Sequence, residues 1–191
     1  MPLKLHPLLE AAGRRSTLPE WAACRPGRRA HAARVAELMT LWSEQLGLPE
    51  ADRVRWAAAG HLHDALKDAP IEALRPLVEP GWPDSLLHAP ACAARLREEG
   101  VRDEELLLAI AHHSTGHTRF EALGECLYVA DFLEPGRGYM NEDLAELRRR
   151  MPDERARVVR VVIRHRVARL LDRGLPLRQD TVRFWNRVVA S

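Results

Sequence analysis

The sequence has 191 residues, a length typical of one domain, and its 46% hydrophobic and 29% charged content excludes wholesale disorder. The formal net charge of +2 gives no reason to expect a nucleic-acid partner. Only 5% of the residues are aromatic while helix-forming residues dominate, which argues against an all-β fold.

Apolar residues recur at helical spacing along nearly the whole chain, and no strand pattern or internal repeat stands out. Prolines and glycines set the expected helix ends, since proline suits the first turn and glycine the C-cap. We predict a single all-α domain at residues 25–191, preceded by an N-terminal extension at 1–24 with no assigned element. In chain order, we expect helices at about 27–46, 49–67, 71–78, 83–99, 103–113, 121–133, 142–150, 153–173 and 181–189.

Three cysteines, Cys24, Cys92 and Cys126, are odd in number and far apart, so a disulfide framework is not expected and a reducing compartment is favoured. No apolar run approaches the roughly 20 residues that a membrane span requires, and residues 1–13 lack the apolar core of a signal peptide. These features predict a cytoplasmic protein without a membrane partner.

Histidine is unevenly distributed, because six of the nine histidines fall between His61 and His117. Within this region, Lys67 follows His63 by four residues and Asp64 by three, so on a helix the three share one sector. Gly60 lies one turn earlier and would leave space there. Imidazole and carboxylate suit iron, manganese or zinc, and an ammonium suits phosphate. The pattern predicts a metal-and-phosphate site, although an isolated His-Asp pair is also compatible with a surface salt bridge.

Further candidate ligands lie outside this segment. His31 falls on an apolar helix face, His88 among leucine and alanine, and His113 near a helix end. Asp131 lies in an otherwise apolar stretch, where an unpaired buried carboxylate is costly. A metal, an arginine or a helix cap would each offset that cost.

Five segments carry these residues in a fixed order. They contain Arg28 and His31; His63-Asp64 with Lys67; Leu86-Leu87-His88; Ala109-Ile110 with His113 and Thr115-Gly116; and Tyr128-Val129-Ala130-Asp131 with Glu134 and Arg137. The ordered set resembles the HD superfamily of metal-dependent phosphohydrolases. It is most similar to the YqeK-type branch, the symmetrically cleaving dinucleoside tetraphosphate hydrolases, over about residues 25–190.

This resemblance implies an HD-domain helical bundle with two metal ions, expected to be a di-iron centre, with manganese or another divalent metal as the alternative. A hydroxide shared by the ions would attack a phosphorus of diadenosine tetraphosphate and release two ADP. The implied ligands are His31, His63, Asp64 and Asp131 for one ion, and His88 and His113, with Asp64 bridging, for the other. The neighbouring His112 leaves open which of the two adjacent histidines is the ligand.

The same resemblance implies roles around the phosphates. Lys67 and Arg137 would neutralise phosphate charge and act in catalysis together with Asp64, since stabilising the spreading phosphoryl charge is the main catalytic term. Arg28 would assist in binding substrate. The turn at Thr115 and Gly116 would also contact it.

Other functions remain as alternatives. The chain could be another HD-type nucleotide phosphohydrolase or phosphodiesterase, or a non-catalytic metal-nucleotide sensor; a homodimer is an open alternative. The arginines at 148–150 and 155–173 could form an RNA patch, but acidic residues accompany them and stacking aromatics do not. A solvated helix face is the favoured interpretation of those arginines.

Overall fold

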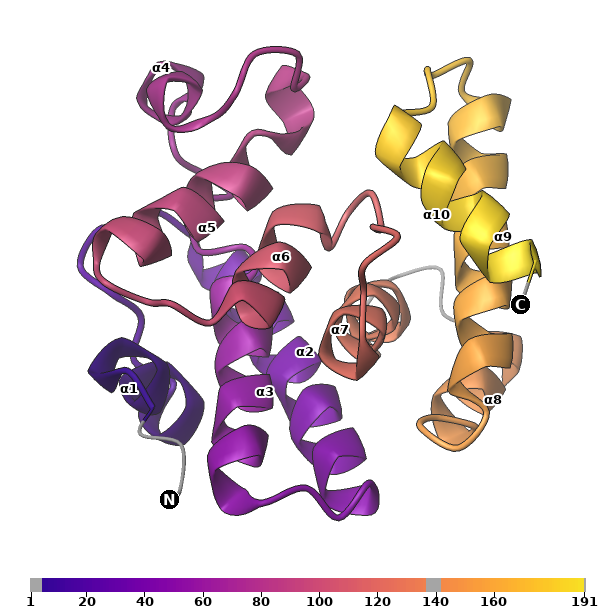
Figure 1. The fold of residues 1–191 in the computed structure, drawn as a ribbon, viewed down its shortest axis with the longest axis horizontal. Coiled ribbons are helices and arrows are strands. Elements are labelled where there is room, and N and C mark those ends of the chain that lie inside the picture. The colour runs from indigo at the N-terminus through magenta and orange to yellow at the C-terminus, as the bar shows by residue number, and fades with distance from the viewer. Residues whose placement is uncertain (1–4, 137–141, 191) are drawn as a thin grey trace.

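Every regular element in the described part of the chain, residues 5–136 and 142–190 of a computed structural model, is a helix, which confirms the all-α prediction (Figure 1). The α-helices are α1 (Pro7–Arg15), α2 (Pro26–Gln45), α3 (Glu50–Leu62), α4 (Ile71–Leu74), α5 (His88–Glu98), α6 (Glu104–His112), α7 (Ala122–Leu133), α8 (Glu142–Arg149), α9 (Arg155–Asp172) and α10 (Gln179–Ala190). Two 3₁₀ turns, η1 (Arg75–Leu77) and η2 (Asp84–Leu86), precede α5.

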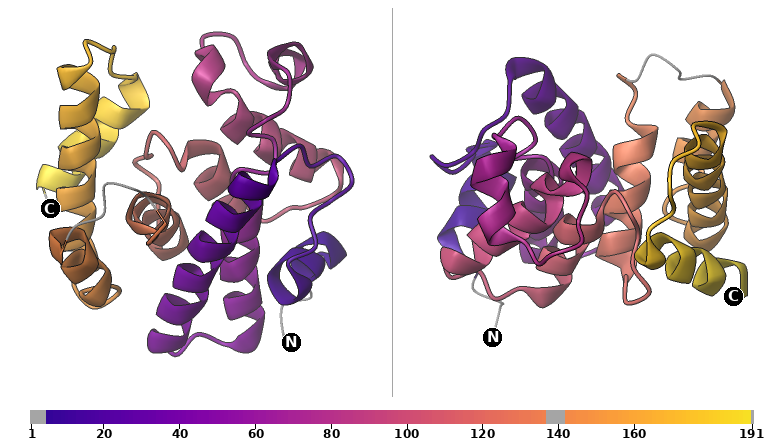
Figure 2. Two further views of the ribbon diagram at one scale, coloured as in Figure 1. Left: turned by 180° about the vertical axis from the view of Figure 1, so that it is seen from behind. Right: turned by 90° about the horizontal axis from the view of Figure 1, so that it is seen from above.

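Helix α7 is the centre of the bundle. It contacts α2, α3 and α6 on one side and α8 and α9 on the other, so that α9 and α10 form a separate layer beyond it (Figure 2). All residues from Cys126 to Leu133 are buried. Asp131 therefore lies in the core, where its charge requires partners. None of the described helices is both long enough and apolar enough to cross a membrane.

Helix α1 lies in the segment to which the sequence analysis assigned no element. His6 caps it by accepting a hydrogen bond from the Leu8 backbone N–H, and Ser16 ends it in the left-handed conformation, with φ of 53°. Leu9 and Ala12 are buried, and the helix packs on α3. Part of the expected extension thus contributes to the same core, while the boundary at residue 24 stays a prediction.

Helix α3 ends at Leu62, so the expectation of a helix as far as residue 67 was wrong. Residues 63–69 form successive turns instead, with Lys67 N–H donating to the carbonyl of Asp64 at 3.0 Å. Ala23 provides the physical reason, because its N–H donates to the Ala65 carbonyl at 2.7 Å and its carbonyl accepts from Asp68 N–H at 3.0 Å. These bonds replace the helical ones.

Gly60 provides close helix packing rather than the ligand space expected of it. A Cβ atom there would lie 2.5 Å from the Ala36 Cα atom of α2. We predict that Gly60→Ala lowers the free energy of unfolding by about 1–3 kcal/mol, because the two backbones must separate. Gly27→Ala is the matched control, since nothing lies within 4 Å of its Cβ position. Urea unfolding measures both; equal stability of the two variants would contradict the packing role.

Candidate metal centre

Six side chains from five parts of the fold converge on one buried cluster. His31 comes from the first turns of α2, His88 from the start of α5, and Asp131 from α7. The remaining three follow the ends of α3 and α6. The cluster consists of His31, His63, Asp64, His88, His113 and Asp131, all buried.

The carboxylate of Asp64 lies between two groups of histidines. Its Oδ2 atom is 3.9 Å from Nε2 of His31 and 3.8 Å from Nε2 of His63. Its Oδ1 atom is 3.2 Å from Nε2 of His88 and 3.5 Å from Nε2 of His113. One carboxylate thus presents a different oxygen to each group, which is the arrangement of a bridging ligand.

Asp131 completes the first group. Its Oδ1 atom lies 3.1 Å from Nε2 of His31 and 3.8 Å from Nε2 of His63, and the two histidine nitrogens are 3.3 Å apart. Ligands about 2.0–2.2 Å from one ion lie about 3 Å or more from each other, so these separations suit a shared cation.

Hydrogen bonds on the far side of three rings set the direction of their free nitrogens. Nδ1 of His63 donates to the Gly60 carbonyl at 2.7 Å, and Nδ1 of His113 donates to the Ile110 carbonyl at 2.8 Å. Nδ1 of His31 lies 3.1 Å from Oε1 of Glu134 and donates to it. For His63 and His113, the neutral tautomer that these bonds favour leaves Nε2 as a bare lone pair directed into the cluster. His31 differs: although burial opposes its charge, the carboxylates of Asp131 and Glu134 raise its pKa while no metal is bound.

The charge states agree with metal binding. Burial lowers the pKa of His63 to about 4, and burial likewise lowers the pKa of His88 to about 4, so both rings are neutral at pH 7. Burial opposes ionisation of Asp64, but the pKa of its carboxyl still lies well below the ordinary value, because the imidazoles of His63, His113 and His88 stabilise the carboxylate in the acid range where they become protonated. Neutral imidazoles and an ionised carboxylate are the forms that bind metals.

The buried acceptor atoms of the cluster are arranged to bind cations. The Oδ1 atom of Asp64 is buried without a hydrogen-bond partner. It faces the bare Nε2 of His113, so two acceptors point at each other in the core, which is costly unless a cation lies between them. Nitrogen and carboxylate ligands suit iron, manganese or zinc. The two buried clusters are therefore consistent with a binuclear metal site.

Comparison with known proteins identifies the family. The family description "HD domain" matches residues 28–162, more than half of the chain. The chain belongs to the HD domain family. A crystal structure of a predicted HD superfamily hydrolase involved in NAD metabolism from Clostridium acetobutylicum has the same fold, with a TM-score of 0.75 over 95% of both chains at 23% identity.

Three curated relatives of this HD domain protein are named bis(5'-nucleosyl)-tetraphosphatase, symmetrical. The protein from Staphylococcus aureus is 32% identical over 116 residues, which cover 56% of this chain and 58% of that protein. The protein from Halalkalibacterium halodurans is 28% identical over 73% of this chain and 78% of its own length. The protein from Bacillus subtilis is 29% identical over 74% of this chain and 80% of its own length.

Two arginines that the sequence analysis did not assign to the site anchor its carboxylates. Arg34 donates through Nε to Oε2 of Glu134 at 2.5 Å, and Arg166 donates through Nη2 to Oδ2 of Asp131 at 2.8 Å. Burial would raise the pKa of Glu134, but the bonds from Arg34, His31 and the backbone lower it to about 2. The sequence analysis places Arg166 with the other arginines of residues 155–173 on a solvated helix face. Only the packing of α9 on α7 distinguishes it from them.

Of the three charged residues expected to bind phosphate, one lies beside the cluster, one is exposed and one lies outside the described residues. Lys67 lies beside the HD domain's second ligand group, with Nζ 3.2 Å from both ring nitrogens of His88. Arg28 is exposed in the first turn of α2. Arg137 lies outside the described residues.

The turn at Thr115 and Gly116 packs against α10. Thr181 donates through its hydroxyl to the Thr115 carbonyl at 2.9 Å. Gly116 has φ of +75°, and a Cβ atom there would lie 2.0 Å from the ring of Phe184. A substrate contact at this turn stays a prediction. The Cβ position of Gly116 faces Phe184 of α10, and the hydroxyl of Thr115 lies 3.2 Å from Nδ1 of His112.

The adjacent histidines point in different directions. His113 faces Asp64 in the cluster. His112 instead lies 3.2 Å from the Thr115 hydroxyl through Nδ1, and its ring faces Trp82 and His117. The geometry therefore favours His113 over His112 as the ligand.

The buried neutral histidines predict an acid-sensitive apoprotein. The pKa of His63 and of His88 is about 4 in the folded protein and 6.5 in the unfolded chain, so the unfolded chain binds more protons between these pH values. The free energy of unfolding is expected to fall as the pH decreases from about 6.5 to about 4, by up to about 3 kcal/mol per histidine. Urea unfolding of chelator-treated protein at pH 7 and pH 4.5 measures this loss. His88→Asn should show a shallower dependence, and an unchanged slope would contradict the assignment.

Proposed function

We propose that this HD domain protein is a two-metal phosphohydrolase that cleaves diadenosine tetraphosphate and related dinucleoside polyphosphates symmetrically to ADP. The observation that carries the proposal is the carboxylate of Asp64, which presents one oxygen to each of two histidine groups. The choice of substrate is supported by the three relatives, which share one enzyme name.

In this proposal each ligand group holds one ion. Iron is the proposed metal, with manganese or another divalent ion as the alternative, because imidazole and carboxylate accept all of these. Two bound ions would lower the pKa of a water molecule and polarise a phosphoryl oxygen. The first ion is assigned to His31, His63, Asp64 and Asp131, and the second to Asp64, His88 and His113.

The remaining roles belong to charged side chains around the phosphates. In hydrolysis the oxygen of water bonds to one central phosphorus, and the bond from that phosphorus to the oxygen bridging the two central phosphorus atoms breaks. The bridging oxygen leaves as a terminal phosphate oxygen of the second ADP, and the protons of water pass to solvent or to the new terminal phosphates. Lys67 would neutralise the charge that develops on the phosphoryl oxygens, because it already lies beside the second ligand group. Arg137 would share this catalytic role, and Arg28 would contact an outer phosphate. The turn at Thr115 and Gly116 would complete the substrate site.

A cytoplasmic location completes the proposal. All three cysteines are free, and Cys92 and Cys126 are buried. Free thiols are typical of proteins kept in a reducing compartment.

One assay tests the proposed function. The purified protein, loaded with reduced iron, is incubated with diadenosine tetraphosphate and the products are separated by chromatography. ADP as the sole nucleotide product is the expected result. AMP together with ATP would contradict symmetrical cleavage, and faster turnover of a mononucleotide would favour another HD-type phosphohydrolase. Nucleotide binding without turnover would favour a sensor.

A further inference from the structure

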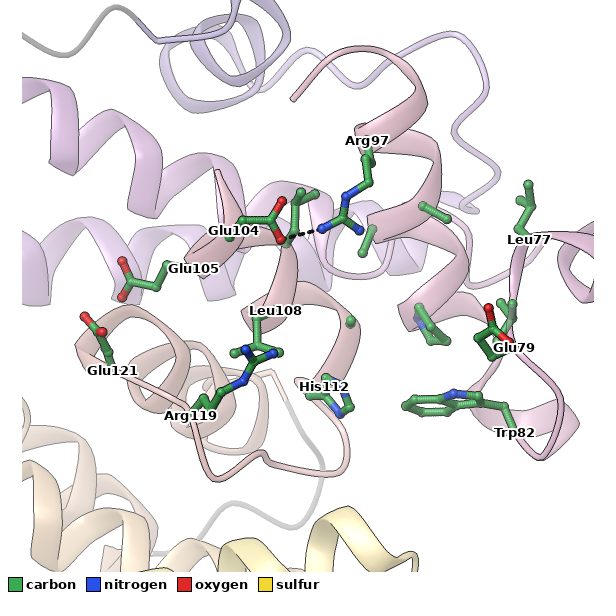
Figure 3. A pocket seen from close by; sticks show the side chains of 16 residues that line it. Leu77, Glu79, Trp82, Arg97, Glu104, Glu105, Leu108, His112, Arg119 and Glu121 are labelled. Carbon is green, nitrogen blue, oxygen red and sulfur yellow. Dashed lines mark hydrogen bonds and ion pairs between the residues drawn. The ribbon is translucent and has the colours of Figure 1, made fainter. Parts of the chain in front are cut away.

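A groove of about 620 Å³ lies on the outer side of α5 and α6, beneath the segment that joins α4 to α5 (Figure 3). Apolar side chains line much of it, among them Leu77 of the joining segment, Pro90 of α5 and Leu108 of α6. Trp82 and His112 lie at one end of it, with their rings facing each other. This volume is in the range of small-molecule sites.

Two parts of the fold, the end of α6 and the segment that enters α5, carry residues of both the groove and the metal cluster. His112, the last residue of α6, lines the groove, while His113, the next residue, faces Asp64 in the cluster. Trp82 lies six residues before His88 on the segment that enters α5. None of the six cluster residues lines the groove, so it is a separate surface that adjoins the metal centre across one turn of α6.

The indole ring of Trp82 is held in position by its neighbours. The guanidinium of Arg178 lies 4.0 Å from the centroid of its ring, and Nη1 of Arg178 donates to the Gly81 carbonyl at 2.9 Å. The ring of His112 lies 5.5 Å away at 55°. These contacts hold the indole in place, and the part of it that Arg178 leaves uncovered lines the groove. A supported π surface of this kind stacks on a nucleobase without losing much side-chain entropy.

The charges around the groove disfavour a phosphate as its occupant. Glu79 and Glu121 carry carboxylates on its rim, and Arg97, which could attract an anion, is paired with Glu104 at 2.5 Å. Arg119 is the other cation among the lining residues. Carboxylates repel phosphate but accept hydrogen bonds from the amino group of a base or the hydroxyls of a ribose. The groove therefore suits a flat, neutral, hydrogen-bonding ring.

We infer that this groove binds one nucleobase of the substrate by stacking on Trp82, while the phosphate chain extends past the end of α6 to the metal cluster. The inference rests on the proposed function, because it needs a nucleotide whose phosphates lie at the metals. It assigns Trp82 as a residue that binds the base and takes no part in bond cleavage.

Calorimetric titration of the metal-loaded protein with ADP and with inorganic pyrophosphate tests this inference, since the two probes share a diphosphate and differ in the nucleoside. Trp82→Ala should weaken ADP binding about 5- to 150-fold, the range expected for loss of one base stack. Pyrophosphate binding should stay within about twofold of the wild type. Trp82→Phe should restore most of the ADP affinity, and Trp82→Leu replaces the alanine variant if that protein fails to fold.

Trp21→Ala is the matched control, because Trp21 is also half-buried beneath an arginine, Arg95 at 5.9 Å, but lies outside the groove. It should bind ADP as the wild type does. Equal ADP affinity in Trp82→Ala and wild type would overturn the inference while leaving the proposed function intact if diadenosine tetraphosphate is still cleaved. Equal weakening of both probes would also overturn it. A wild-type protein that neither binds ADP nor cleaves diadenosine tetraphosphate would overturn the proposed function together with the inference.

Discussion

Replacement of Asp64 by alanine is expected to abolish metal retention and to lower turnover by more than about 1,000-fold. Its carboxylate faces both sets of histidines, so in the proposed two-metal site its loss would remove a ligand from each ion at once. Changes to residues that only orient a metal ligand already cost about 10- to 100-fold. A bridging ligand should cost more.

Metal content by elemental analysis and ADP release from diadenosine tetraphosphate measure the effect of Asp64→Ala. Asp68→Ala is the control, because Asp68 lies in the same turns but accepts a hydrogen bond from the Arg25 backbone N–H at 2.8 Å. The control should keep both metals and the wild-type rate. Full activity of Asp64→Ala would show that the two-metal assignment is wrong.

Lys67→Ala is expected to retain both metals and to lose about 100- to 1,000-fold in kcat, the typical cost of removing one group that stabilises transition-state charge. Nζ of Lys67 lies 3.2 Å from the ring nitrogens of His88, so its charge is next to the second ligand group without belonging to it. The loss should fall mainly on kcat, because the charge on the phosphoryl oxygens grows in the transition state.

Steady-state kinetics and metal content on the same preparation separate the two roles that Lys67 could have. Lys67→Arg should recover part of the rate, since it restores the positive charge but not the compact ammonium. Arg164→Ala, which removes an exposed cation from α9, should leave kcat unchanged. Loss of metal from Lys67→Ala would mean that the lysine supports the structure of the centre and does not act on the phosphates.

The sequence determined the helical architecture because it depends on local periodicity. The stripe that includes Val159, Val162 and Ile163 predicts a helix at about the position of α9, and these residues are buried as the spacing requires. The approximate ends of most helices followed from glycine and proline in the same way. Contacts between distant segments shifted the end of α3, because the backbone of Ala23 takes over the bonds of Ala65 and Asp68. No local pattern contains that pairing.

The sequence also indicated which residue types could bind metal, because histidine and aspartate in apolar surroundings are costly without partners. It did not determine which nitrogen or oxygen faces which, and the helical sector proposed for His63, Asp64 and Lys67 was wrong. Each oxygen of the Asp64 carboxylate meets its own group of histidines only because α2, α5, α6 and α7 pack together. Arg166 shows the same limit: it is one arginine among many in the sequence, and only the contact of α9 with α7 brings its guanidinium to Asp131. Local periodicity determines helices, whereas the geometry of a buried polar cluster depends on side chains far apart in the chain, whose directions only tertiary packing sets.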